Sequence, residues 1–257
     1  EAVAGISGLL SMGLYILVGR WSDRVGRKKP LVIGAALALL LMFPLFWGMG
    51  SMANPGLAEK ANTTPVVVAG NQCHTDPFAD LFGRKQSACG NLLETLSADG
   101  VAYQVKEAPE LSLQVGGQAV SIDPKWLTDA AARKKGIETA LGAHGFDFSV
   151  QKPGFMALLG IGAMLLGFGL LSALTYGGVA AQLTEMFPAK IRYSSMSIPY
   201  HIGAGYLGGF LPLIASYINA RTGNAYSGLW YTWAVVAFGL LVAIWGLRGG
   251  PPREFDP

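Results

Sequence analysis

Charged side chains are scarce in this chain. Asp, Glu, Lys and Arg make up 14% of its 257 residues, against roughly a quarter in an ordinary soluble domain. The shortage is uneven, because residues 51–152 contain 9 basic and 11 acidic side chains, whereas the rest of the chain contains 10 and 5. This pattern excludes a single soluble globule of uniform composition. The net charge of +3 arises from short clusters, which excludes a nucleic-acid binder with a basic surface.

Cysteine is scarcer still, with only Cys73 and Cys89 in the sequence. No Cys-x-x-Cys pair is present, so thioredoxin-type chemistry is not expected. A zinc site that uses His74 is disfavoured, because one Cys-His pair and a distant cysteine do not have zinc-ligand spacing. Two free thiols remain an alternative. In an oxidising compartment we expect a Cys73–Cys89 disulfide, worth about 3 kcal/mol by loop entropy, and we expect no metal and no cofactor.

Long uncharged apolar runs account for the low charge content. Crossing a bilayer takes about 20 apolar residues. A run at residues 2–18 is slightly short, and no charged region precedes it, so we interpret it as a spanning helix cut off at its outer end and not as a signal peptide. Five such runs argue against the alternative of buried core helices in a large soluble protein. The four full-length runs are residues 31–52, 155–181, 195–219 and 229–247.

Basic residues predict the orientation, because they gather in cytoplasmic loops. The loop between the first two runs carries five basic residues and one acid, while the connector 182–192 and the tail 248–257 carry two basic residues each. These three segments fall on one side when five helices alternate. We therefore expect a multi-pass protein of a plasma membrane, of the bacterial inner-membrane type. Its C-terminus is expected to be cytoplasmic and residues 53–152 extracytoplasmic.

The extracytoplasmic segment, residues 53–152, has the pattern of a small α/β domain. Asp123 precedes Pro124 as a helix N-cap precedes a first-turn proline. Gly116-Gly117 lies between two alternating runs and predicts a hairpin turn. The expected elements are helices over 87–97 and 124–144, a strand over 101–106, and hairpin strands over 111–115 and 118–122.

Two cytoplasmic segments carry recognisable motifs. Residues 19–29 read GRWSDRVGRKK and fit the pattern G-x-x-x-D-R-x-G-R-[RK]. This pattern resembles the signature loop of the major facilitator superfamily of secondary transporters. Residues 182–192 read QLTEMFPAKIR. Their E-x-F-P-x-x-x-R pattern, followed by a Ser- and Gly-rich helix, resembles the connector between the tenth and eleventh helices of the metabolite:proton symporters.

The resemblance implies an α-helical membrane protein that comprises five transmembrane helices of a C-terminal half, with a small α/β extracytoplasmic insertion. It implies proton-coupled symport of a small polar metabolite by alternating access, and no enzyme activity. The implied partners are the lipid bilayer and a missing N-terminal half of the transporter. The expected division is helices eight and nine in 1–52 with a cytoplasmic loop at 19–30, the insertion in 53–152, helices ten to twelve in 153–247, and a cytoplasmic tail at 248–257.

The resemblance also implies that the motif charges keep the cytoplasmic side closed. Asp23 in a tight loop can cap a helix N-terminus, Gly19 allows close packing, and Gly26 permits the turn. Arg24 and Arg27 can reach an acidic partner such as Glu185. A basic loop that only sets topology is the alternative. The expected gate residues are Gly19, Asp23, Arg24, Gly26, Arg27, Glu185 and Arg192.

Polar groups inside membrane helices are candidates for the transport path, because burying them in hydrocarbon is costly. His201 lies in the fourth run, between Pro199 and Gly203, and its imidazole suits a proton relay. The alternative is a packed, hydrogen-bonded histidine. Hydroxyl groups often only join neighbouring helices. The weaker candidates are Tyr200, Tyr176 and Thr175.

Two other classes of protein remain as alternatives. Gly5-Ile6-Ser7-Gly8 resembles the G-x-S-G of rhomboid proteases, which would need Ser7 within hydrogen-bond reach of His201. That interpretation leaves the motif at 19–29 unexplained, and position 204 is Ala where rhomboids have Gly. A membrane-anchored sensor with an extracytoplasmic ligand-binding domain is permitted by the insertion, although no motif supports it.

Overall fold

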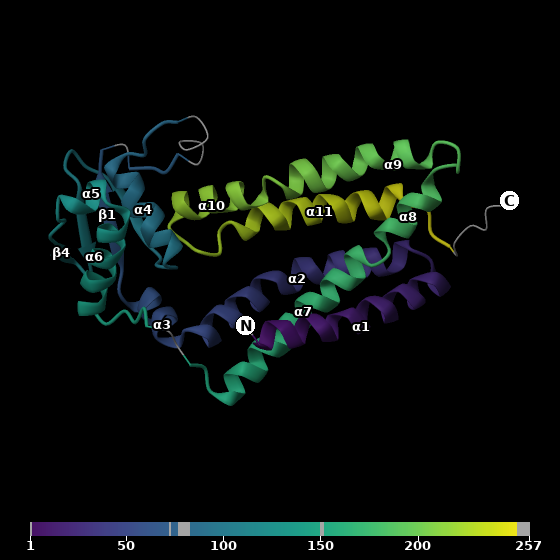
Figure 1. The fold of residues 1–257 in the computed structure, drawn as a ribbon, viewed down its shortest axis with the longest axis horizontal. Helices are drawn as coiled ribbons and strands as arrows, with labels where there is room; N and C mark the ends of the chain where they lie inside the picture. The colour runs from purple at the N-terminus through teal and green to yellow at the C-terminus, as the bar shows by residue number, and fades with distance from the viewer. Residues whose placement is uncertain (1, 72, 77–82, 150–151, 251–257) are drawn as a thin grey trace. The chain divides into compact units, whose positions relative to one another are not determined.

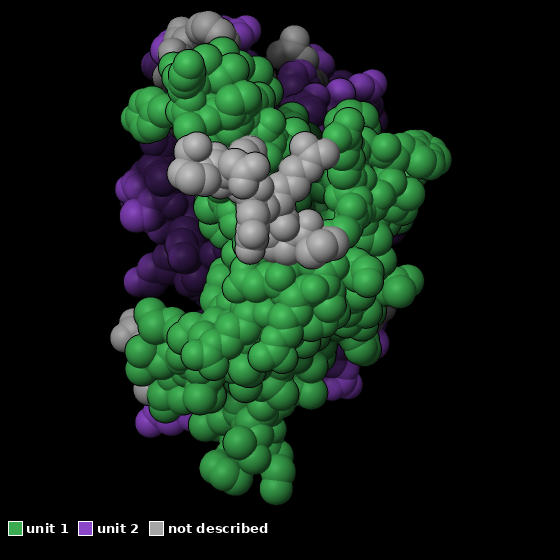
Figure 2. Space-filling view, turned by 90° about the vertical axis from the view of Figure 1, so that its right-hand side faces the viewer, with its two compact units in different colours: residues 1–52, 153–211, 231–257 green, residues 53–152, 212–230 purple. Residues whose placement is uncertain are grey.

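The computed structural model describes residues 2–71, 73–76, 83–149 and 152–250. Most of the expected tail at 248–257 therefore lies outside the described residues. The chain divides into two compact units, coloured separately in Figure 2. The first comprises residues 1–52, 153–211 and 231–257, and the second comprises residues 53–152 and 212–230.

The first unit is helical (Figure 1). Four of its helices are long and apolar enough to span a membrane: α1, α2, α7 continuing into α8, and α11. They expose large apolar side chains such as Leu9 and Trp245, which are 68% and 80% exposed. Exposed apolar faces of this kind are favourable in contact with the hydrocarbon of a lipid bilayer. The elements are α1 (Ala2–Val25), α2 (Lys28–Ala53), α7 (Phe155–Tyr176), α8 (Val179–Met186), α9 (Arg192–Tyr200), the π-helix η1 (His201–Gly208) and α11 (Leu229–Gly246).

The segment expected as the fifth spanning helix, 195–219, is helical but is not one regular α-helix; within it the N–H groups of Gly209 and Phe210 donate to the Gly205 and Tyr206 carbonyls at 3.1 Å. The segment is divided into α9, η1 and α10 (Leu211–Thr222). Pro199 lies inside α9 and lacks a backbone N–H, and the widened π-helical turns of η1 begin two residues later. A proline and a run of glycines weaken regular helical hydrogen bonding. Within the described residues, four regular helices are therefore long and apolar enough to span a membrane.

Close contacts hold α7 against α1 and α2. A Cβ added at Gly34 of α2 would lie 2.6 Å from Leu174 Cβ, and one added at Gly48 would lie 2.6 Å from the Met164 side chain. The Tyr15 hydroxyl of α1 hydrogen-bonds the Ser172 hydroxyl of α7 at 2.6 Å. Small residues let helix backbones approach in this way inside membranes.

The second unit is built on a mixed four-stranded sheet in the order β2-β1-β3-β4. The central strand β1 was not anticipated from the sequence; it is parallel to β2, which it reaches through helix α4, and antiparallel to β3. The expected hairpin is confirmed, with Gly116 and Gly117 at φ of 59° and 81°. The strands are β1 (Val66–Gly70), β2 (Gln104–Glu107), β3 (Ser112–Val115) and β4 (Gln118–Val120).

The helices of this unit cover the sheet, and their buried leucines fill the core. The helix expected over 124–144 is divided at Asp129, whose backbone is extended and whose carboxylate accepts the N–H groups of Ala131 and Ala132 at 2.8 and 3.3 Å. An N-cap there starts a second helix. The helices are α3 (Pro55–Thr63), α4 (Ala88–Ala98), α5 (Lys125–Thr128) and α6 (Ala130–Ala143). Fully buried core side chains include Val66, Val68, Leu92, Leu93, Leu96, Leu113, Ile137 and Leu141.

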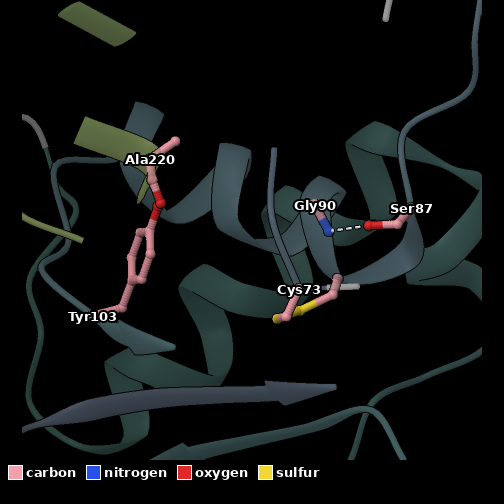
Figure 3. The surroundings of a disulfide bond; sticks show 6 residues. Cys73, Ser87, Gly90, Tyr103 and Ala220 are labelled. Carbon is pink, nitrogen blue, oxygen red and sulfur yellow. Dashed lines mark hydrogen bonds between the residues drawn. A yellow bond between two sulfur atoms is a disulfide. The ribbon is translucent and has the colours of Figure 1, made fainter. Parts of the chain in front are cut away.

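A disulfide joins Cys73, in the segment after β1, to Cys89 in the first turn of α4 (Figure 3). Their Cα atoms lie 4.9 Å apart. Ser87 caps the same helix, since its hydroxyl accepts the N–H of Gly90 at 2.9 Å. The cross-link therefore ties the chain that leaves the central strand to the helix that crosses over to β2.

The turn between α10 and α11 is held against the α/β sheet by Tyr103. Its hydroxyl donates to the Ala220 carbonyl at 2.7 Å (Figure 3), and its backbone N–H donates to the Gly223 carbonyl at 2.9 Å. Gly223 has φ of +67°. Burial raises the pKa of Tyr103, and the hydrogen bond with Ser97 offsets only part of this effect. Residues 212–230 and residues 53–152 together form the second unit.

Replacing Tyr103 by Phe should loosen this attachment. The change removes the hydroxyl but keeps the ring, and it leaves the Ala220 carbonyl without its donor, which costs about 1–3 kcal/mol. Chemical unfolding of the purified chain, followed by tryptophan fluorescence, measures the loss. Tyr226→Phe is the matched control, because the Tyr226 hydroxyl in the same turn forms no hydrogen bond within the described residues. Equal effects of the two substitutions would contradict the attachment.

Candidate functional site

The motif at 19–29 forms a short turn between two long helices, and not the expected loop over 19–30. Helix α1 continues through Val25, and α2 begins at Lys28. Gly26 ends α1 with φ of +89°, and its N–H donates to the Ser22 carbonyl at 2.9 Å, which is a glycine C-cap. Asp23 is therefore a side chain of the last turn of α1. Pro30 is tolerated in the first turn of α2, where no intrahelical donor is needed.

Arg27 is the centre of the site because it contacts acidic groups from two helices. Its guanidinium forms an ion pair with Asp23 of α1 and another with Glu185 of α8, the latter at 3.0 Å between Nε and Oε1. It also donates to the Ser22 hydroxyl at 3.2 Å. The Arg27 side chain is 13% exposed and Glu185 is 21% exposed, whereas Asp23 is 60% exposed.

The electrostatics of Arg27 follow from this geometry. Burial alone would lower the pKa of Arg27, but the hydrogen bonds and charges of Asp23 and Glu185 outweigh burial and raise the pKa above its ordinary value. The pair with Asp23, whose side chain is exposed, is worth about 0.2–1 kcal/mol. The pair with Glu185 is more shielded from water, so it dominates the attraction between the α1–α2 turn and α8.

Lys28 joins the same site to a fourth helix. Its ammonium donates to the carbonyls of Ile244 and Leu247 at 2.6 and 2.9 Å, at the C-terminal end of α11. A positive charge there complements the helix dipole and satisfies carbonyls without an intrahelical partner. A cavity of about 450 Å³ lies beside these contacts. Its lining includes Arg27, Gln182, Glu185 and Arg248.

The other motif residues do not enter this cluster. A Cβ added at Gly19 would meet no atom within 4 Å, so the expected close packing is not present in the described chain. Arg24 is exposed. Arg192 starts α9, and its Nε donates to the Phe187 carbonyl at 3.3 Å. Gly26 does require its glycine, because an added Cβ would collide with the Gly250 carbonyl.

The four transport-path candidates are only partly brought together. The hydroxyls of Tyr176 and Tyr200 lie 3.4 Å apart, and the Tyr200 and His201 rings are edge to face at 5.9 Å. His201 Nδ1 lies 2.8 Å from the Ser197 carbonyl, one helical turn back. Thr175 donates to the Leu171 carbonyl at 2.8 Å within its own helix. Thr175 therefore does not join the other three.

Ser7 and His201 are not placed as a catalytic pair. Ser7 is buried on α1, where an added Cβ at Gly162 of α7 would lie 3.9 Å from its hydroxyl oxygen. His201 is exposed, and its Nδ1 faces its own helix. Figure 1 shows α1 and α9 on opposite sides of the first unit. Within the described residues, no group of three or more His, Cys, Asp or Glu side chains could hold a metal ion.

Two contributors were missed from the sequence. Ser22 is fully buried beside Arg27, and it stands at a variable position of the motif pattern. Lys28 occupies the last motif position, but only the fold reveals the α11 carbonyls that it caps. The signal for Ser22 was its place one helical turn before Gly26, where a small side chain faces the turn.

Lys28→Met should destabilise the first unit, because the last turn of α11 loses its capping charge. The expected cost is about 0.5–1.5 kcal/mol, measured as a lower unfolding midpoint of the purified chain in detergent. Lys29→Met is the matched control, since Lys29 is exposed and lies at the same helix start. The capping role would be contradicted if Lys29→Met lowered the midpoint as much as Lys28→Met.

Comparison with known proteins finds transporters. The chain is similar to the citrate-proton symporter of Klebsiella pneumoniae, with 30% identity over 176 residues, which are 66% of this chain and 36% of the symporter. It is 34% identical over 83 residues to a protein described as a proline/betaine transporter of Staphylococcus aureus, covering 32% of this chain and 17% of that protein. A protein of Staphylococcus haemolyticus with the same description is 30% identical over 96 residues, which are 37% of this chain and 20% of that protein.

These similarities are distant and partial. The chain spans about a third of the length of the symporter and less of the other two. No family model and no solved structure matches it. The relatives are transporters and not enzymes, and four apolar helices indicate a multi-pass membrane protein. The chain is thus similar to secondary transporters of the kind that the motif at 19–29 predicts.

Proposed function

We propose that this chain is a C-terminal portion of a major facilitator superfamily transporter whose complete form catalyses proton-coupled symport by alternating access. The observation that carries the proposal is the ion pair from Arg27 of the motif to Glu185 of the second connector. The two motifs were identified separately in the sequence, and the fold brings them into contact. Similarity to a citrate-proton symporter supports the same assignment.

The Arg27 cluster acts as the cytoplasmic gate in this proposal. Its contacts connect α1, α8 and, through the neighbouring Lys28, α11. Opening the cytoplasmic side then requires these elements to separate. A shielded ion pair suits a reversible gate, because water entering the opening solvates both charges and offsets the attraction that is lost.

The transported metabolite is proposed to carry a carboxylate. Citrate, proline and betaine, the substrates in the relatives' names, share this group and are small and polar. Tyr176, Tyr200 and His201 form the polar patch that this chain contributes to the path, and His201 has the chemistry for proton transfer. Partner groups from the remainder of the transporter complete the site, as two repeats do in alternating access.

The proposed orientation has the Arg27 cluster in the cytoplasm and residues 53–152 outside. Basic side chains surround the motif turn, as the positive-inside rule requires. The Cys73–Cys89 disulfide belongs to the second unit, and an extracytoplasmic compartment is where such bonds persist.

Uptake into cells that express the complete protein tests the proposal. Labelled citrate, proline and betaine are supplied separately, with and without a proton ionophore. Arg27→Gln should lower ionophore-sensitive uptake by at least about tenfold, because it leaves Glu185 as an unpaired, partly buried charge.

Arg20→Gln is the matched control, since Arg20 is exposed in the same segment and occupies a variable motif position; it should retain uptake. Immunoblotting of the membranes corrects for protein amount. If no probe is accumulated, or if Arg27→Gln transports as well as Arg20→Gln, the proposal is contradicted.

A further inference from the structure

The second unit contains a cavity of about 580 Å³ that the transport proposal does not use. One wall is residues 74–76, which follow the disulfide, and the other is a face of α10. All of the lining residues belong to this one unit. They are His74, Thr75 and Asp76 on the first wall and Leu213, Ile214, Tyr217 and Arg221 on the second.

Both walls are held firmly. His74 directly follows the cross-linked Cys73, and a Cβ added at Gly90 of α4 would lie 2.7 Å from the His74 carbonyl oxygen. The amide of Gln86 bonds both backbone groups of Asp76, at 3.0 and 2.8 Å. On the other wall, Tyr103 bonds the carbonyl of Ala220, the residue before Arg221. A ligand would therefore meet a largely preformed site.

The charges in the cavity favour an anion. The Arg221 guanidinium lies over the Tyr217 ring, 5.5 Å from its centroid, and within the described residues no carboxylate is within ion-pair distance of it. The carboxylate of Asp76 instead lies 3.6 Å from the guanidinium of Arg84. Arg221 is thus the charge of the cavity that an incoming ligand can neutralise, and guanidinium groups bind carboxylates through two parallel hydrogen bonds.

The remaining lining groups set the size and polarity of the ligand. The Thr75 hydroxyl is buried in the wall and has no hydrogen-bond partner in the described part of the chain, and the imidazole of His74 can donate or accept a further bond. Leu213 and Ile214 provide an apolar surface. We propose that this cavity is a binding site for a small carboxylate with a short aliphatic body, with Arg221 as its anion-binding residue.

This site gives the insertion a function of its own. A carboxylate bound by Arg221 and by groups of residues 74–76 would bridge α10 and the segment that follows the disulfide. A failure of this proposal can be told apart from a failure of the proposed transport, because ligand binding to the purified chain is measured directly and does not require uptake.

Calorimetric titration of the purified chain in detergent tests the site, with succinate as the probe. Succinamide, its uncharged diamide of the same size, is the matched ligand. Succinate should bind saturably with one site per chain, and succinamide should not. Arg221→Gln should weaken succinate binding by at least about tenfold, because a charge-assisted hydrogen bond is lost. Thr75→Val should weaken it by a smaller factor.

Lys106→Gln is the control, since Lys106 is an exposed cation on β2 of the same unit; it should bind succinate as the parent chain does. Unfolding midpoints verify that each variant is folded. If Arg221→Gln proves unstable, Arg221→Lys is used instead; because it keeps the charge, it should retain part of the succinate affinity. The proposal is overturned if succinate does not bind, if succinamide binds equally, or if Arg221→Lys and Arg221→Gln leave the affinity unchanged.

Discussion

The arrangement of the first unit depends on how the partly buried Arg27 guanidinium is neutralised. A charge that is largely removed from water must be paired, and the carboxylates of Asp23 and Glu185 supply the pairing. Because Glu185 belongs to α8, the ion pair sets where the α1–α2 turn lies against the α7–α8 segment. Lys28, one residue later, extends the same connection to the end of α11. Two consecutive basic residues thus link the α1–α2 turn to α8 and to the end of α11.

The second unit is held together by different means. Its sheet buries a conventional aliphatic core, and the disulfide and Tyr103 attach the less regular segments to that core. Tyr103 contributes two hydrogen bonds to residues 212–230, which belong to this unit despite their distance in sequence. The proposed carboxylate site lies between residues 74–76 and α10, the helix whose Ala220 carbonyl accepts the Tyr103 hydrogen bond.

Features that depend on local composition could be predicted from the sequence. Uncharged runs indicated four helices that the structure contains, and the Gly116-Gly117 pair indicated the hairpin. Features that depend on competition between interactions could not be predicted from the sequence. Asp129 divides a helix because its backbone is extended and its carboxylate caps the helix that follows. The run that contains Pro199 changes from an α-helix to a π-helix two residues after the proline, although hydropathy alone would count it as one regular span. The contacts of Ser22 and Lys28 could not be predicted either. The sequence does not show that the Arg27 guanidinium lies beside Ser22, or that the carbonyls at the end of α11 lie beside Lys28.

The coupling between Arg27 and Glu185 is the most direct test of the account. Gln182 lines the same cavity, and among the described residues no cysteine is free, so Gln182→Cys provides a site for a water-soluble maleimide. Its labelling rate is measured in the complete protein with Arg27→Gln, with Glu185→Gln and with both. We predict that each single change speeds labelling and that the double change adds little to the larger single effect, because one shared interaction has been removed. Single changes without effect, or effects that multiply as for independent sites, would contradict a gate held by this ion pair.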